Sequence, residues 1–323
     1  MVSKGWMEQK IGNGISLNDI AKEAGVTKEE LDKLLQSYAL EQDQKSDYTF
    51  EDLQTIALAN QKILRQVGGS HPNTYHQLRI KTDKPIALVF IADIHVGAIE
   101  CALSLLFDDI EIMKKTDRLF VILGGDSIDN YIQPSKMSGV LESGLPIVIQ
   151  WEILEEILKK LKNKVLTIGT SCHQDWQRKV SGFDYTEKLA EKYNLLYTGW
   201  GATIDLFIGD QKYTIHKRHK MRVSSMYNIY HGIQQLYRFG DSIFDLGISE
   251  HKHTGGFAWF EGHGQPRLAL HCGTYKITDW YLQEHAYPTS LPITPTVIFY
   301  PDRKKMLPFL TVRDAIAVLK HEI

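Results

Sequence analysis

Histidine, aspartate and cysteine side chains recur in this chain in short motifs, most of which directly follow an apolar run. These residue types supply the nitrogen, oxygen and sulfur ligands that transition metals bind in proteins. In chain order the motifs are Asp93-Ile94-His95, Gly124-Gly125-Asp126, Cys172-His173-Gln174-Asp175, His216 and His251-Lys252-His253. Together they provide enough ligands for two divalent cations and leave one histidine spare.

The first three motifs lie at the carboxyl ends of predicted strands. Residues 85–94 contain a run that is apolar on both faces, which predicts a buried central strand. The segments 118–126 and 164–171 are similar, and α/β sheets bind their ligands at this end of the strands. Asp126 alone would also fit a helix N-cap. Three consecutive strand ends with ligand side chains are much harder to obtain by chance, so we expect a site at this edge.

Two of the motifs have their ligands at spacing i and i+2. Alternate residues of an extended segment point to the same side, so Asp93 and His95 could share one ion. By the same argument His251 and His253 could serve one ion each. His216 lies on a further strand of alternating pattern. Any one of these motifs would mean little alone, but together they complete a two-metal ligand set.

Strands and helices alternate through the middle of the chain, which implies a mainly parallel sheet. Its expected strands are 85–94, 118–126 and 164–171, with helices at 101–115, 146–162 and 184–193. Shorter segments then predict a second, more antiparallel sheet, at 195–199, 202–209, 211–217, 267–276 and 294–301. Two facing mixed sheets flanked by helices would make residues 85–323 an α/β domain, a four-layer α/β/β/α sandwich.

Residues 1–69 are expected to form a separate helical module. Residues 16–36 have apolar positions at helical spacing, and Gly25 stands where a tight turn between two helices needs a small residue. This pattern resembles a helix-turn-helix. A further helix is predicted at 50–67, and residues 70–84 are expected to be a linker.

Charge and composition limit the partners. Acidic residues outnumber basic ones ten to six over residues 15–66, the wrong sign for phosphate contacts, so docking or self-association into a homo-oligomer fits the module better than DNA binding. The 323-residue chain has a net charge of −2 and three cysteines without close pairing, which favours a reducing compartment. No membrane-spanning run or secretory signal is visible, so we expect a cytoplasmic protein without a membrane partner.

The motifs resemble those of the calcineurin-like metallophosphoesterase family over about residues 85–300. The family's five motifs fall in order on Asp93-Ile94-His95, Gly125-Asp126, Ser171-Cys172-His173-Gln174, His216 and Glu250-His251-Lys252-His253. The segment from His216 to His231 also looks like phage and prophage members of the family. The resemblance therefore implies an enzyme of a bacterium or a phage-infected host.

The resemblance also implies a role for each residue. The implied ligands of one metal are Asp93, His95, Asp126 and His253, and those of the other are Asp126, Cys172, His216 and His251. His173 would act as the catalytic acid or stabilise the transition state, with Asp175 orienting it. Separately, from their sequence positions beside these motifs, Asn130, Trp176, Arg218 and His219 are expected to contact the substrate.

Two residues depart from the family pattern. Cys172 replaces the usual asparagine, so the second metal would be a softer one if the thiolate binds, and a weakly held one if it does not. Glu250 replaces the usual glycine before His251, where it would crowd the turn or act as hydrogen-bond partner of a ligand.

The implied function is hydrolysis of phosphate esters by two divalent cations, with manganese, zinc, iron and nickel as candidates. We expect a phosphodiesterase or nuclease acting on nucleotides or nucleic acid. The alternatives are a phosphomonoesterase or protein phosphatase, and a catalytically weak DNA-binding or scaffold protein.

Overall fold

The computed structural model describes residues 7, 10–11, 13–33, 35, 49–66, 75–131, 143–225, 227–240, 243–278, 283–284, 286 and 289–322. The chain divides into two compact units, which we call the N-terminal unit and the large unit. They are Met1–Ser70 and His71–Ile323.

The large unit contains two six-stranded sheets, and the first has the order β12-β11-β2-β3-β4-β5. Its strands are β2 (Ile86–Ile91), β3 (Leu119–Leu123), β4 (Val165–Ile168), β5 (Leu196–Tyr197), β11 (Thr296–Phe299) and β12 (Met306–Phe309). Strands β2 to β5 pair in parallel, whereas β11 is antiparallel to both of its neighbours. Every residue of β2 is buried, which confirms the central strand predicted from its apolar run.

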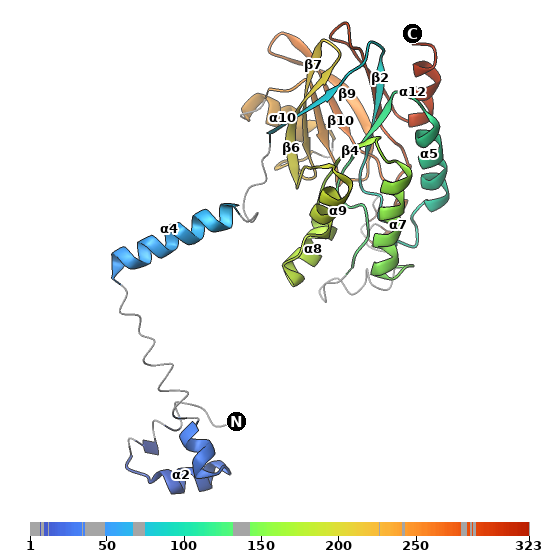
Figure 1. The fold of residues 1–323 in the computed structure, drawn as a ribbon. Coiled ribbons are helices and arrows are strands. Elements are labelled where there is room, and N and C mark those ends of the chain that lie inside the picture. Colours follow the sequence, from blue (N-terminus) through green and yellow to red (C-terminus); the bar gives the residue numbers. More distant parts are fainter. Residues whose placement is uncertain are drawn as a thin grey trace. The chain divides into compact units, whose positions relative to one another are not determined.

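Helices cover the outer face of this sheet (Figure 1). They are α5 (Leu103–Lys115), α7 (Ile147–Lys160), α9 (Tyr185–Tyr193) and α12 (Val312–Leu319). Their apolar faces pack with alternate residues of β2 and β3 into one core. The first three were predicted within two residues at each end. A short helix that was not predicted, α8 (Cys172–Ser181), begins just beyond β4.

The second sheet has the order β1-β6-β7-β8-β10-β9. Its strands are β1 (Tyr75–Ile80), β6 (Gly201–Ile208), β7 (Gln211–Arg218), β8 (Leu246–Ser249), β9 (Gly256–Gly262) and β10 (Gln265–His271). A second apolar core lies between the two sheets, and α10 (His231–Phe239) packs on the outer face of β8 and β9. The large unit is therefore the expected four-layer α/β/β/α sandwich.

Three expectations about the strands were wrong. The segments 195–199 and 294–301 were assigned to the second sheet, but their strands β5 and β11 pair with β4 and β2 in the first. The second sheet has three parallel and two antiparallel pairings, as the first does, so it is not the more antiparallel of the two. Residues 75–80 were assigned to the linker, but they form β1, which pairs in parallel with β6. The apolar pattern of a short segment predicts a strand but does not indicate which strand it pairs with.

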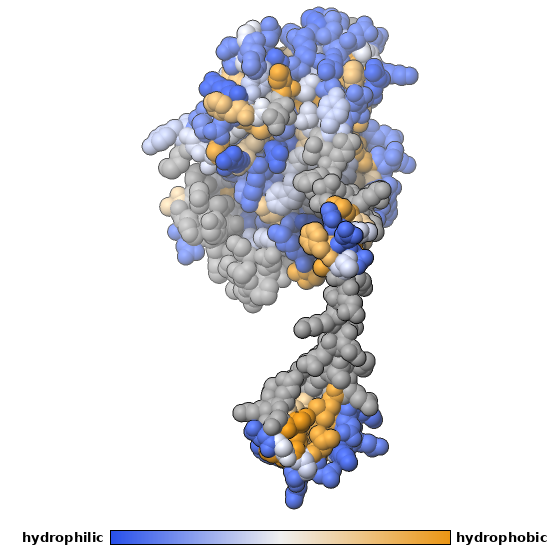
Figure 2. Space-filling model, turned by 90° about the vertical axis from the view of Figure 1, so that its left-hand side faces the viewer, coloured by the Kyte–Doolittle hydropathy of each residue, from blue (hydrophilic) through white to orange (hydrophobic). Residues whose placement is uncertain are grey.

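The N-terminal unit contains the predicted helices α2 (Leu17–Ala24) and α4 (Phe50–Gln66). Gly25 ends α2 in the left-handed conformation, and Thr27 with Glu30 caps a following helix. A small core that includes Ile20 and Leu31 joins α2 to this following helix. Figure 2 shows apolar side chains gathered on the visible face of the N-terminal unit. Residue 67, where the second predicted helix ends, lies outside the described residues. None of the helices in the described part of the chain is long and apolar enough to cross a bilayer.

Candidate metal centre

Ligand-type side chains from both sheets meet at the carboxyl ends of the strands. Asp93, Asp126 and His173 follow β2, β3 and β4 of the first sheet. His219 and His251 follow β7 and β8 of the second sheet. Residues beyond the ends of five strands therefore converge at one edge of the sandwich, which is where the sequence predicted a site.

Three overlapping groups of side chains bring their potential ligand atoms within 4.8 Å of one another. They are Asp126, Cys172, His219 and His251; Asp93, His95 and His253; and His95, Asp126 and His173. Oδ2 of Asp126 lies 3.1 Å from Nε2 of His219 and 3.9 Å from Nδ1 of His251. Because Asp126 belongs to two groups, its carboxylate is the natural bridge between two cations.

His95 and His253 face each other through their Nε2 atoms, 3.0 Å apart. Nδ1 of His95 lies 2.9 Å from the carboxylate of Asp129, to which it donates, and this leaves the lone pair on Nε2. Beside them, Oδ2 of Asp93 accepts from the backbone N–H of His251 at 2.8 Å. Oδ1 of Asp93 is buried without a hydrogen-bond partner among the described residues. This set of nitrogen and oxygen donors fits a divalent cation.

Burial controls the protonation of the group formed by Asp93, His95 and His253. It raises the pKa of Asp93 to about 8 and lowers the pKa of His95 to about 4. Burial and the neighbouring His95 also hold the pKa of His253 well below its usual range. Both imidazoles are therefore neutral at physiological pH, which is the form that binds a metal.

Around Asp126, neighbouring imidazoles outweigh burial in setting the pKa values. Burial would raise the pKa of Asp126, but His173 and His219 hold it well below its usual value. Burial also raises the pKa of Cys172, but hydrogen bonds from His219 and His251 lower it to about 6. A thiolate is thus accessible near neutral pH, and thiolates bind zinc and iron strongly.

The backbone is strained at the same positions. Asp93, His95, Asp126, His251 and His253 all have positive φ, between 50° and 76°. Side chains other than glycine rarely adopt this conformation, and it persists only where the surrounding structure enforces it. Strain concentrated on the candidate ligands themselves indicates that the fold is built to place these side chains.

Buried charges behind the site fix His219. Oε2 of Glu250 lies 3.1 Å from Nδ1 of His219 and accepts the backbone N–H of Gly125 at 2.9 Å, while Oε1 pairs with the buried Lys217 at 2.9 Å. A Cβ at Gly124 would overlap the carboxylate of Glu250. Of the two roles considered for Glu250, the structure favours hydrogen-bond partner of a ligand. No pattern in the sequence predicts that Lys217 is buried beside it.

His173 is held by its own backbone and by a carbonyl. Its N–H donates to Oδ1 of Asp126 at 3.1 Å, and its Nδ1 contacts the carbonyl oxygen of Asp129. The expectation that Asp175 orients it was wrong, because Asp175 is buried in ion pairs with Arg178 and Lys179 on its own helix. Asp129, which contacts both His95 and His173, was missed. Its only signal was its place three residues after Asp126.

The structure does not bring His216 to the centre. Nδ1 of His216 bonds to Thr203 at 2.9 Å, and its ring stacks on Phe244 at 5.6 Å, on the face of the second sheet covered by α10. Side chains alternate along β7, so the next residue, Lys217, points to the other face. His219, expected only to contact substrate, lies beyond the strand end and takes the place that the sequence analysis gave to His216.

The other expected substrate contacts are placed differently from one another. Asn130 is buried, its Nδ2 donates to the carbonyl of His173 at 2.6 Å, and its Oδ1 has no partner among the described residues. Trp176 packs its ring 4.3 Å from that of His173. Arg218 is exposed and, two residues from His216, follows the same face of β7. Substrate binding by these residues stays a prediction.

Comparisons with known proteins give only distant likenesses. No protein-family model matches the sequence, and no curated protein matches it. Among solved structures it is similar to a metallophosphoesterase from Sphaerobacter thermophilus (15% identity, 73% of this chain and 93% of the other, TM-score 0.34). It is also similar to the calcineurin-like phosphoesterase YfkN from Bacillus subtilis (8%, 74% and 96%, 0.37) and to Vps29 from Chaetomium thermophilum (11%, 69% and 96%, 0.35). Identities and scores this low do not assign a function, which has to come from the side chains.

Proposed function

We propose that this chain is a phosphoesterase that uses two divalent cations to hydrolyse phosphodiesters of nucleotides or nucleic acid. One observation carries the proposal: Asp126, which follows β3, groups with Cys172, His219 and His251 and also with His95, and His95 in turn groups with Asp93 and His253. A two-metal site needs a shared carboxylate of this kind.

The chain offers four ligands to each cation. We assign Asp93, His95, Asp126 and His253 to one, and Asp126, Cys172, His219 and His251 to the other. Manganese, zinc, iron and nickel are the candidates, and Cys172 favours zinc or iron at the second position. When bound, the cations would supply a hydroxide nucleophile near neutral pH and neutralise charge on the phosphoryl oxygens.

His173 supplies the proton chemistry in this proposal. Its Nδ1 is engaged with the carbonyl oxygen of Asp129, so Nε2 is the nitrogen left to contact the substrate. From there it would donate a hydrogen bond to a phosphoryl oxygen and protonate the leaving alkoxide. The hydrogen bond from the backbone N–H of His173 to Oδ1 of Asp126 holds this residue beside the bridging carboxylate.

Aromatic rings beside His173 support a substrate that carries a base. The ring of Trp176 lies 4.3 Å from His173 and 5.3 Å from Tyr131. Aromatic faces of this kind stack on nucleobases without strong sequence preference. The net charge of −2 disfavours tight binding of long duplexes, so single strands and small nucleotides are the expected substrates.

The test is hydrolysis by metal-free protein to which manganese, zinc or nickel is added back. We expect cleavage of bis-p-nitrophenyl phosphate. His173→Ala should lower kcat about a hundredfold to a thousandfold while the bound metal stays unchanged. His321→Ala, at an exposed histidine near the carboxyl terminus, is the matched control. Cleavage of p-nitrophenyl phosphate alone would indicate a phosphomonoesterase, and no cleavage with any metal would overturn the proposal.

A further inference from the structure

A cavity of about 490 Å³ lies at the other end of the strands from the candidate metal centre. Tyr213 stands near the start of β7, Asp245 directly precedes β8, and Arg267 is near the start of β10. The first sheet contributes Lys304, on the turn before β12, and Met306, the first residue of β12. The cavity therefore spans both sheets, and its volume is that of a small-molecule site.

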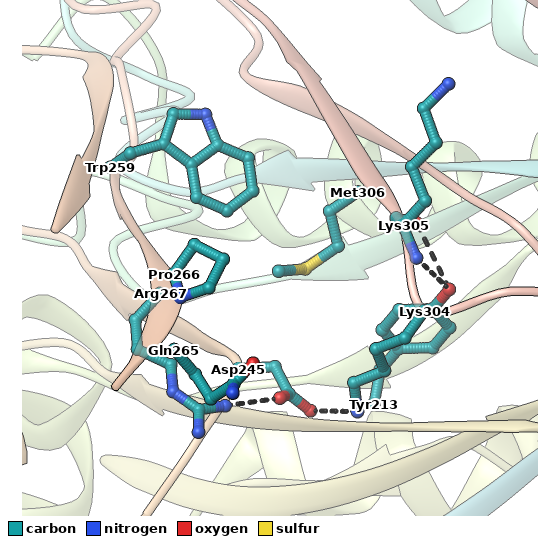
Figure 3. A pocket seen from close by; sticks show the side chains of 9 residues that line it. All are labelled: Tyr213, Asp245, Trp259, Gln265, Pro266, Arg267, Lys304, Lys305 and Met306. Atoms are coloured by element: carbon teal, nitrogen blue, oxygen red, sulfur yellow. Dashed lines mark hydrogen bonds and ion pairs between the residues drawn. The ribbon is translucent and has the colours of Figure 1, made fainter. Parts of the chain in front are cut away.

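The floor of the cavity, formed by Asp245, Arg267 and Lys304, has more hydrogen-bond donors than acceptors available. The carboxylate of Asp245 already accepts three hydrogen bonds, from Arg267 at 2.6 Å, from Lys304 at 2.6 Å and from the backbone N–H of Thr214 at 2.8 Å. Figure 3 shows Asp245 between the two cations. It fixes both cations in place and has little acceptor capacity left for a ligand.

The two cations keep donors to spare. Arg267 uses one Nη group on Asp245, and its buried Nε has no hydrogen-bond partner among the described residues. Lys304 donates two of its three N–H groups, one to Asp245 and one to the carbonyl oxygen of Lys212. Two cations face one carboxylate, so the floor is net positive and offers mainly donors. Its complement is an anionic group rich in acceptors.

The walls of the cavity are apolar. Trp259 is 46% exposed although it lies on strand β9. Figure 3 shows Met306 extending between the Trp259 ring and the floor, with Pro266 below Trp259 and the side chain of Lys305 pointing away. An exposed indole and a flexible thioether are surfaces on which a flat ring packs well.

We propose that this cavity is a second binding site, independent of the metal centre, for a small molecule that joins a planar aromatic ring to one anionic group. The ring packs on Trp259 and Met306, and the anion binds Arg267 and Lys304. Nucleoside monophosphates and aromatic carboxylates share this chemistry, and the experiment below separates them.

The test is calorimetric titration of the full-length, metal-free chain with adenosine monophosphate and, separately, with indole-3-acetate. We expect at least one of them to bind, and adenosine or inorganic phosphate alone to bind about tenfold more weakly or worse, since each lacks one half of the recognised structure. The better of the two probes tells whether the anion is a phosphate or a carboxylate.

Variants locate the binding. Trp259→Ala and Arg267→Gln should each weaken it about tenfold or more. Lys304→Gln, at a side chain that is about half exposed, repeats the test if Arg267→Gln fails to fold. Arg303→Gln, on the same turn but outside the cavity lining, and Trp176→Ala, at the metal centre, are controls that should leave it unchanged. Binding that depends on Trp176 and not on Trp259, or no binding of either probe, would overturn the proposal.

Discussion

Asp126 and Asp245 lie at opposite ends of the same sandwich, each between two basic side chains. Asp126 has His219 and His251 beside it, whereas Asp245 is held by an arginine and a lysine. Imidazoles can release their proton and accept a metal ion, but guanidinium and ammonium groups stay charged. Under our two proposals, the same arrangement of charge therefore suits one end to cations and the other to anions.

The backbone separates the two ends further. Candidate metal ligands such as Asp93, Asp126 and His253 have positive φ. None of the nine residues lining the cavity, all of them described, does so. Strain is kept where several groups must converge on one ion, whereas a cavity between sheets needs no unusual backbone.

The largest expected effect separates the two aspartates. Asp126→Asn should remove the bridge between the metals, lower the bound metal below two ions per chain and reduce diester hydrolysis about a thousandfold or more, because metal ions contribute several kcal/mol to such reactions. Asp245→Asn should keep both ions. Metal content is measured by elemental analysis after dialysis. Equal metal loss in the two variants would show that the ends are not distinct.

The next effect separates two histidines that lie three residues apart. His219→Ala should weaken the second metal about tenfold to a hundredfold or more and leave Glu250 buried without one partner. His216→Ala should lower stability through the lost packing on Phe244 but leave metal affinity unchanged. Competition with a metal-binding dye measures the affinities. Metal loss in His216→Ala but not in His219→Ala would restore the original assignment.

These two histidines show what the sequence could predict and what it could not. The first sheet's central strand and the ligands after β2 and β3 follow from long apolar runs that end in polar residues. The choice between His216 and His219 depends on where β7 ends and which face each residue takes, and a strand pattern alone does not determine either. The burial of Lys217 could not be predicted for the same reason.

The remaining errors concern the pairing partners of predicted strands and one strand that was not predicted. Strands β5 and β11 were predicted as strands but assigned to the wrong sheet, because pairing is decided by packing across the whole unit. β1 was missed because its exposed, polar residues alternate with half-buried ones at the edge of the second sheet. Edge strands resemble linkers in sequence because they bury little.

The pH dependence of stability tests the electrostatics of the metal end. Burial raises the pKa of Asp93 to about 8, so the folded chain holds a proton there that the unfolded chain has released above about pH 4. This contribution to stability is full at low pH and is lost as the pH rises through 8. In chelator, Asp93→Asn should gain stability over the unchanged chain between pH 5 and pH 8, by roughly a few kcal/mol.

Urea unfolding at the two pH values measures that gain. Titrating groups far from Asp93 are common to both chains and cancel in the difference, whereas His219, Asp126 and Glu250 interact with Asp93 and contribute to it. Added metal should reverse the order at pH 8, because it binds the deprotonated carboxylate of the unchanged chain. A difference that stays constant with pH in chelator would contradict the buried, protonated Asp93.

The smallest expected effect concerns the N-terminal unit and uses the corrected boundary. Deleting residues 1–70 should leave metal content and diester hydrolysis within about twofold, because every candidate ligand lies in the large unit. Deleting residues 1–84 also removes β1, the bond from Tyr75 to Asp205 and the pairing that covers the edge of β6. An exposed β6 edge invites aggregation, so the longer deletion should lose stability although it removes no ligand.

Size-exclusion chromatography and thermal unfolding compare the two shortened chains with the full-length chain. If the shorter deletion changes oligomeric state alone, the N-terminal unit serves assembly, and if it lowers a salt-sensitive affinity for DNA, that unit binds nucleic acid despite its acidic balance.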